Sequence, residues 1–150
     1  MLWPIMPKAP FSKTRQAFRV LLALAFLAAG VLHLVVPGPF LAITPDWVTR
    51  PETVIRLTGL AEIAGAIGLM TRRFCVAAGI GLALYAVCVY PANLHHALDP
   101  DVTLPQLGWA YHAPRLLLQP VIVWLCLWAS HAIEWPFGRE TKSSSQAQSE

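Results

Sequence analysis

The stretch that decides the fold is VIRLTGLAEIAGAIGLMTRRFCVAAGIGLALYAVCVY, which runs from Val54 to Tyr90. It contains two apolar segments, Val54 to Met70 and Phe74 to Tyr90, separated only by Thr71 to Arg73. A helix needs about 20 mainly apolar residues to cross the hydrocarbon core of a membrane. Because each segment approaches that length and the connection is a tight turn, the sequence predicts two antiparallel neighbouring membrane helices.

Two further apolar segments flank this pair, Ala17 to Val36 and Leu116 to Ile133. Of the 150 residues in the chain, 56% are hydrophobic and only 13% are charged, which is typical of a membrane protein and unusual in a soluble one. The first segment follows basic residues, as a signal peptide would, but its apolar core is too long and no A-x-A cleavage signal follows it. The sequence therefore predicts an all-α, integral membrane four-helix bundle.

The predicted domain organisation is one transmembrane domain, residues 17–135, between two terminal segments. Residues 1–16 are expected to form a cytoplasmic N-terminal segment, and residues 136–150 a polar, low-complexity, disordered tail. The connections after the first and third spans contain prolines and aromatic side chains such as Phe40, Trp47 and Trp109. Such segments suit short interfacial elements, and we expect them to cap the outer surface of the bundle.

The distribution of basic residues predicts the orientation of the bundle. Eight of the eleven Lys and Arg residues precede the first span or lie at its start, lie in the second connection or follow the last span, which leaves Arg50, Arg56 and Arg115 for the other side. By the positive-inside rule, this multi-pass protein of the cell membrane has both termini in the cytoplasm. No basic stripe alternates with aromatic residues, so the expected partner is the lipid bilayer, and no nucleic acid is expected.

Polar side chains are concentrated in the predicted outer half, and the inner half is expected to hold almost none. Glu62 lies ten residues after Glu52, where the helix is expected to enter the membrane, and is therefore about 15 Å deep; an ionisable group there is costly and usually faces a partner inside the bundle. We expect an outward-facing polar pocket in which Glu62 is coupled to Arg115 or Gln119. The candidate binding residues are His33, Arg56, Glu62, Asn93, His95, Arg115 and Gln119.

Three of these candidates also have a purely structural interpretation. Glu62 could lock the helices together by accepting hydrogen bonds from the last span. Asn93 could cap the third span after Pro91, because asparagine commonly satisfies free backbone groups at helix ends. Arg56 lies about 120° around the helix from Glu62 and could extend to the membrane surface.

A metal or haem site is not expected from the histidines and cysteines. The chain has no His-x-x-x-His and no Cys-x-x-Cys, and the adjacent His95 and His96 would diverge by about 100° on a helix. Cys75, Cys88 and Cys126 lie within apolar spans and are expected to be small buried residues.

Four segments together resemble the DoxX-like family of small four-helix membrane proteins: GVLHLVVPGPFLAITPDWV, LTGLAEIAGAIGLMTRRF, VYPANLHHAL and RLLLQPVIVWLCLWA. The resemblance covers about residues 17 to 130. It rests on a histidine, a Gly-x-x-Glu, a Pro-Ala-Asn and an Arg-x-x-x-Gln, which here are His33, Gly59/Glu62, Pro91/Ala92/Asn93 and Arg115/Gln119. It implies an accessory subunit in redox or quinone-linked metabolism rather than a complete enzyme.

Three hypotheses for function follow. The first is an accessory membrane subunit of a redox complex whose pocket receives a quinone head group or a small anion, with Arg115 binding the acceptor oxygen and Glu62 handling the proton. The second is a homo-oligomeric, proton-linked transporter or pore for a small solute. The third is a structural membrane scaffold. The sequence names no substrate, and it contains no cofactor-binding signature, which suits an accessory subunit better than a complete oxidoreductase.

Overall fold

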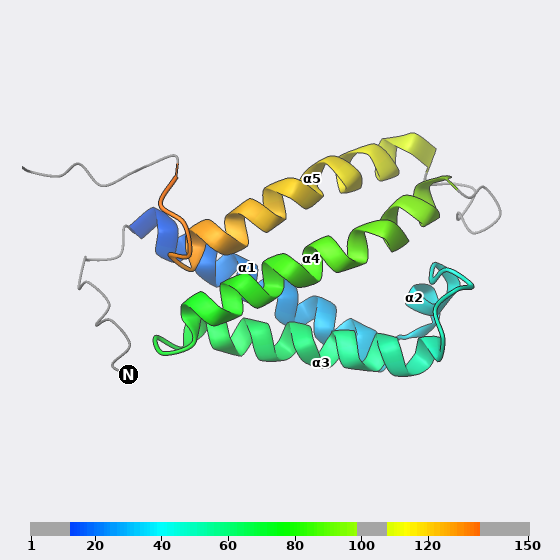
Figure 1. Ribbon diagram of the computed structural model, residues 1–150, viewed down its shortest axis with the longest axis horizontal. Coiled ribbons are helices and arrows are strands. Elements are labelled where there is room, and N and C mark those ends of the chain that lie inside the picture. The colour runs from blue at the N-terminus through cyan, green and yellow to red at the C-terminus, as the bar shows by residue number, and fades with distance from the viewer. Residues whose placement is uncertain (1–12, 99–107, 136–150) are drawn as a thin grey trace, which may run out of the picture.

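The computed structural model describes residues 13–98 and 108–135 of the chain. These residues form five helices and no strand: α1 (Lys13–Val35), α2 (Gly38–Ala42), α3 (Pro51–Met70), α4 (Cys75–Leu98) and α5 (Gly108–Ala129). All except the short α2 are long and apolar enough to cross a membrane (Figure 1). The prediction of an all-α, four-helix membrane bundle is therefore confirmed. Most of the predicted N-terminal segment and all of the predicted tail lie outside the described residues.

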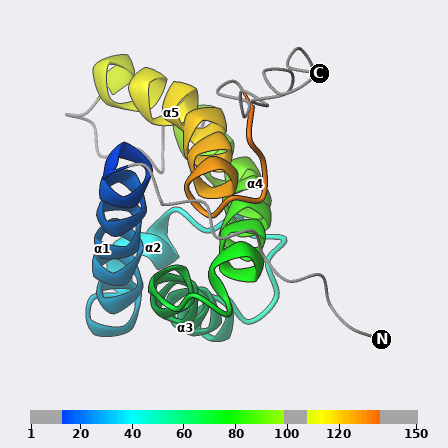
Figure 2. The same cartoon turned by 90° about the vertical axis from the view of Figure 1, so that its left-hand side faces the viewer.

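The four long helices run up and down between two ends of the bundle (Figure 1). One end, which we call the turn end, holds the start of α1, the turn from Thr71 to Phe74 and the end of α5. The other end, which we call the α2 end, holds α2 and the start of α5. Figure 2 shows α1 beside α3 and α4 beside α5, and these are the two most extensive helix pairs in the bundle.

The outer surface of the bundle is apolar along the long helices. Leu21, Leu57 and Leu117 are 62%, 60% and 72% exposed, and many other large hydrophobic side chains also face outward. Water would make such a surface unfavourable, whereas lipid would not, so the chain is a multi-pass membrane protein. The buried apolar core includes Leu22 and Leu69, and it lies mainly toward the turn end.

A close helix contact joins α1 and α3 at a pair of glycines. A Cβ atom on Gly59 would lie 2.9 Å from the carbonyl oxygen of Gly30 and 2.8 Å from the Cβ atom of His33. Only glycine permits this approach of two backbones. Between α3 and α4, Gly65 packs on Leu82, whereas Gly81 has open space beside it.

Two helices extend further toward the α2 end than the sequence predicts. α4 does not end at Tyr90 but continues through Pro91 to Leu98, and α5 begins at Gly108 and continues through Pro114. Membrane helices tolerate proline because neighbouring helices can satisfy the backbone groups that it leaves free. The interpretation of Asn93 as a helix-end cap is therefore wrong, and residues 99–107 of the expected surface cap lie outside the described residues.

Candidate functional site

The helical extensions bring five polar side chains together between α4 and α5. Asn93 and His96 are three residues apart on α4, and His112, Arg115 and Gln119 follow one another at spacings of three and four on α5. At 100° per residue, each set lies on one face of its helix, and these two faces are in contact. We call these five residues the α4/α5 cluster.

Arg115 and Gln119 tie the α4/α5 cluster together. The guanidinium of Arg115 donates through Nη1 to Nδ1 of His96 at 2.9 Å and through Nη2 to Oδ1 of Asn93 at 2.6 Å. The amide of Asn93 donates to Oε1 of Gln119 at 3.2 Å, and Nε2 of Gln119 donates to the carbonyl oxygen of Ala86 at 2.6 Å. The structure thus brings together three of the candidates chosen from the sequence, Asn93, Arg115 and Gln119.

The two histidines of the α4/α5 cluster are buried and short of partners. His96 is 5% exposed and His112 is 3% exposed. Their rings meet edge to face, with centroids 4.8 Å apart and planes at 87°. Among the described residues, Nε2 of His96 and both ring nitrogens of His112 have no hydrogen-bond partner. Buried polar atoms of this kind are uncommon in folded proteins and call for an explanation.

The α4/α5 cluster also has an unbalanced charge. Arg115 is always protonated, and its hydrogen-bond partners are the neutral amide of Asn93 and a ring nitrogen of His96. Within residues 13–98 and 108–135, no carboxylate forms an ion pair with it. Asp99 and Asp101 lie outside the described residues. The described part of the cluster therefore offers more donors than acceptors and carries a positive charge.

A second polar cluster, which we call the α1/α3 cluster, consists of His33, Glu62 and Tyr85. Glu62 faces the bundle interior and is 4% exposed. Nδ1 of His33 lies 3.0 Å from Oε2 of Glu62 and 2.8 Å from the carbonyl oxygen of Ala29. A proton on Nδ1 therefore has two possible acceptors. Phe40 of α2 stacks on the His33 ring, with centroids 3.8 Å apart.

The predicted coupling of Glu62 to Arg115 or Gln119 is wrong. The Gly30–Gly59 contact brings α1 against α3, so Glu62 meets His33 rather than a residue of α5. Arg115 instead interacts with α4 and with the ring of Tyr111. The candidate residues thus belong to two clusters on different helix pairs rather than to one pocket.

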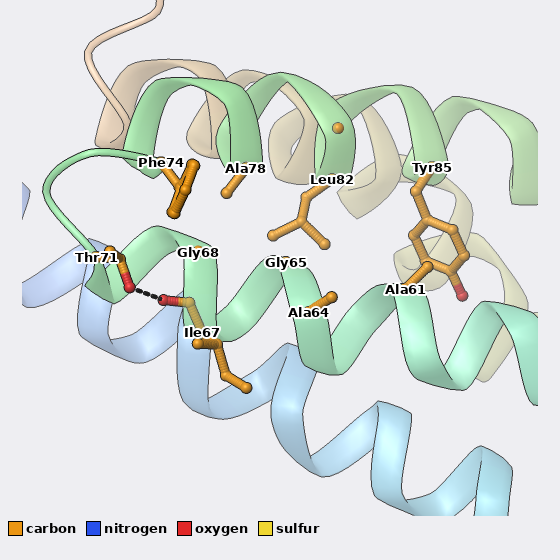
Figure 3. Close-up of a pocket in the computed structure, with 11 residues that line it drawn as sticks. Ala61, Ala64, Gly65, Ile67, Gly68, Thr71, Phe74, Ala78, Leu82 and Tyr85 are labelled. Atoms are coloured by element: carbon orange, nitrogen blue, oxygen red, sulfur yellow. Dashed lines mark hydrogen bonds between the residues drawn. The ribbon is translucent and has the colours of Figure 1, made fainter.

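Tyr85 connects the α1/α3 cluster to a groove between α3 and α4. Its hydroxyl interacts with the carboxyl of Glu62 and with Thr58. The groove has a volume of about 710 Å³, and Figure 3 shows Tyr85 at one end of it and Thr71 near the other. Small and apolar side chains line the rest: Ala61, Ala64, Gly65, Ile67, Gly68, Phe74, Ala78, Gly81 and Leu82. The α4/α5 cluster does not line this groove.

The hydrogen bonds of Arg115 and the ion pair of Glu62 described above do not include Arg56 or His95. Arg56 is exposed on α3, and His95 is half-buried beside His96, which is the histidine that contacts Arg115. Sequence reasoning missed the roles of His96, His112 and Tyr85. The first two would have been found if the helical spacing had been carried through Pro91 and Pro114. No sequence signal identifies Tyr85, because its contact with Glu62 depends on how α4 packs on α3.

The expectation of an almost apolar inner half is also wrong, because a third polar cluster lies at the turn end. Arg15 and Arg19 of α1 are only 6% and 9% exposed. Arg15 hydrogen-bonds Nδ1 of His131, donates to Oε2 of Glu134 at 3.1 Å and lies 4.8 Å from the ring centroid of Trp128. We call Arg15, His131, Glu134 and Trp128 the turn-end cluster. The prediction failed because it treated basic residues before the first span as exposed.

Local backbone geometry and electrostatics explain the turn-end cluster. His131 follows the end of α5 in the left-handed conformation, with φ of 66°, and this turn places its ring beside Arg15. The hydrogen bond from Arg15 lowers the pKa of the Glu134 carboxyl. Burial, and then the charge of Arg15, lowers the pKa of His131. Both shifts favour a neutral imidazole beside an ionised carboxylate.

The cysteines and histidines show no metal-binding arrangement in the described residues. No group of three or more His, Cys, Asp or Glu side chains there is placed to hold a metal ion. Cys75 and Cys126 are buried, as expected, but Cys88 is exposed on the outer face of α4. Cys75 accepts a long hydrogen bond from Arg19, with 3.7 Å between Nη1 and Sγ.

Comparison with known proteins assigns the chain to a family. Residues 22–132 match the family described as a domain of unknown function, DUF8561, and the chain belongs to that family. No curated protein and no solved structure matches it significantly.

Proposed function

We propose that this DUF8561 protein is an accessory subunit of a redox-linked membrane system, and that its α4/α5 cluster binds an acceptor oxygen of a quinone head group or a small oxyanion. The observation that carries the proposal is the excess of donors around Arg115. The likeness to DoxX-like proteins supports the redox context, because it rests on three residues of this cluster, Asn93, Arg115 and Gln119.

Arg115 supplies the binding energy in this proposal. A charged donor in a membrane interior interacts strongly with an acceptor oxygen because little water screens it. Asn93 and His96 hold the guanidinium in place from α4, and Gln119 holds Asn93 from α5. Such a second layer of hydrogen bonds limits the motion of the binding group before the ligand arrives.

The α1/α3 cluster is the proton-handling part of the proposal. Reduction of a quinone to a quinol consumes two electrons, which partner subunits would supply, and two protons. Glu62 is a buried carboxyl whose Oε2 lies beside Nδ1 of His33, and its contact with Tyr85 reaches the groove between α3 and α4. Carboxyl, imidazole and phenol groups in contact can exchange a proton among themselves.

Ligand binding by purified protein tests the proposal. The protein in detergent is titrated with decylubiquinone and, separately, with sulfate, and binding is followed by tryptophan fluorescence and by the thermal unfolding temperature. Arg115→Met should weaken binding of the preferred probe at least about tenfold, because a hydrogen bond to a charged donor contributes about 1.5–3 kcal/mol. Arg56→Met is the matched control, since Arg56 is an exposed arginine on α3. Failure of the unmodified protein to bind either probe would contradict the proposal.

The redox context needs a separate test. Tagged protein is purified from native membranes in mild detergent, and the proteins and quinones that accompany it are identified by mass spectrometry. We expect a redox enzyme and a quinone in amounts comparable to the protein. Isolation as a homo-oligomer without either would favour the transporter hypothesis instead.

We further propose that the turn end faces the cytoplasm and the α2 end faces outward. Lys13, Arg15 and Arg19 of α1 and Arg72 and Arg73 of the α3–α4 turn lie at the turn end. The start and end of the bundle share that end, so both termini would be cytoplasmic. A reporter fused after residue 150 should read cytoplasmic, and one inserted between residues 99 and 107 should read outside.

A further inference from the structure

The hydrogen bond from Arg115 determines which ring nitrogen of His96 carries the proton. A guanidinium can only donate, so Nδ1 of His96, 2.9 Å from Nη1 of Arg115, must accept. In a neutral imidazole the proton then lies on the other nitrogen, Nε2. That N–H group is buried and has no partner among the described residues. His96 therefore presents an unused donor.

His112 adds a second unused donor beside the first. A histidine ring carries at least one N–H group in either of its usual protonation states. His112 is 3% exposed, and neither of its ring nitrogens has a partner among the described residues. It lies one helical turn before Arg115 and edge to face with His96. The two imidazoles and the guanidinium thus belong to one set of side chains.

We propose that His96 and His112 are the specificity-determining residues of the α4/α5 cluster, which donate through Nε2–H of His96 and a ring N–H of His112 to one acceptor oxygen of the quinone or oxyanion while Arg115 binds another. This inference rests on the proposed function and deepens it by naming the residues that select the ligand. A buried donor without an acceptor destabilises a protein, and an acceptor oxygen removes that penalty.

The same geometry selects against cations. A metal ion needs a ring-nitrogen lone pair, but Nδ1 of His96 is occupied by the bond from Arg115 and Nε2 carries the proton. The nearby guanidinium also repels a cation. The site should therefore accept groups that only accept hydrogen bonds and should reject divalent metals.

Two substitutions at position 96 separate the roles of the two ring nitrogens. In His96→Asn, the amide oxygen can replace Nδ1 and accept from Arg115, but no group replaces Nε2–H. In His96→Gln, the longer side chain places its amide N–H group near the position of Nε2. We expect His96→Asn to weaken binding of the preferred probe, decylubiquinone or sulfate, about fivefold, and His96→Gln to bind within about twofold of the unmodified protein.

His112→Phe removes both nitrogens of the second ring while keeping an aromatic side chain, and it should also weaken binding about fivefold. His95→Asn is the matched control, because His95 is half-buried outside the bonds of Arg115. Thermal unfolding checks that each variant is folded. If His96→Asn does not fold, the comparison of His112→Phe with His95→Asn carries the test.

The possible results separate this inference from the proposed function. If the unmodified protein binds neither probe, the proposed function fails. If Arg115→Met loses binding while His96→Asn and His112→Phe retain full affinity, the proposed function stands and the inference is overturned. Stoichiometric binding of Zn²⁺ that disappears in His96→Asn or His112→Phe would also overturn it. Loss in those two variants with retention in His95→Asn and His96→Gln is the expected result.

Discussion

Arg15 at the turn end and Arg115 in the α4/α5 cluster are both held by hydrogen bonds to protein groups, yet their surroundings differ in one respect. Arg15 pairs with a carboxylate, Glu134, whereas the bonds of Arg115 go to the neutral Asn93 and to His96. Charge in a membrane protein is costly and is usually compensated. An arginine that holds two helices together needs its counter-charge within the fold, whereas an arginine that binds a ligand gains from having none.

The surrounding histidines repeat this difference. His131 uses its Nδ1 atom to accept from Arg15 and lies 3.5 Å from a carboxylate oxygen of Glu134. In contrast, no carboxylate among the described residues forms an ion pair with His96 or His112. The turn-end cluster therefore compensates the charge of its arginine with a carboxylate, whereas the described part of the α4/α5 cluster can still add an acceptor.

The largest expected effect on stability comes from replacing the compensated arginine. Arg15→Met should lower the free energy of unfolding by about 2 kcal/mol, because it leaves Glu134 and His131 without their donor and removes the cation–π contact with Trp128. We place the value below the range for fully buried pairs because the Glu134 side chain is 38% exposed. Unfolding by denaturing detergent, followed by circular dichroism, measures it.

Arg115→Met should change the free energy of unfolding by less than about 1 kcal/mol, because removal of a charge that has no carboxylate partner among the described residues offsets the lost hydrogen bonds. Ligand binding should respond in the opposite way, with loss in Arg115→Met and retention in Arg15→Met. Equal stability losses in the two variants would show that both arginines are structural and would remove the contrast between the clusters.

An intermediate effect is expected from a double-mutant cycle on the α1/α3 cluster. His33→Ala and Glu62→Ala should be coupled by about 1 kcal/mol, because the two side chains contact each other at 3.0 Å. Glu62→Ala and Arg115→Ala should be additive within about 0.5 kcal/mol, because they belong to different clusters. The same detergent unfolding experiment measures both cycles. The arrangement of the clusters would be contradicted if the Glu62 and Arg115 substitutions were coupled while the effects of the Glu62 and His33 substitutions simply added.

The smallest expected effect is the pH dependence of the turn-end cluster. The pKa of His131 is lowered in the folded protein, so below about pH 6.5 the unfolded chain binds more protons and stability falls with acidification. The pKa of Glu134 is lowered as well, so its contribution is complete above the ordinary carboxyl pKa and is lost as the pH falls through the lowered value. Both groups therefore act in the same direction, but in different pH ranges.

Two variants separate these pH ranges in thermal unfolding scans. His131→Asn should remove the decline between about pH 7 and 5, and asparagine tolerates the left-handed backbone at this position. Glu134→Gln should leave that decline in place and remove the one at lower pH. A decline between pH 7 and 5 that persists in His131→Asn would show that another group is responsible.

The membrane helices could be predicted from the sequence because their signal is local. Residues that face lipid must be apolar over the length of a span, so the long apolar segments and the low charge indicate the spans directly. The short connection at Thr71 to Arg73 marks the turn between two of them. The burial of Glu62 could also be expected, since a carboxyl that deep in a membrane is rarely exposed to lipid. The ends of α4 and α5 were harder to predict from the sequence, because Pro91 and Pro114 would disrupt a helix in water but do not end these helices in the bundle.

The sequence by itself determined that this chain crosses a membrane with four helices and carries polar side chains within them. Only the tertiary structure decided which of those side chains meet. Glu62 pairs with His33 because Gly30 and Gly59 let α1 approach α3, and Arg115 meets His96 because α4 and α5 both continue through their prolines. Each polar side chain can only contact a residue of a helix that packs beside its own. Which helices pack together depends on contacts between residues far apart in the chain.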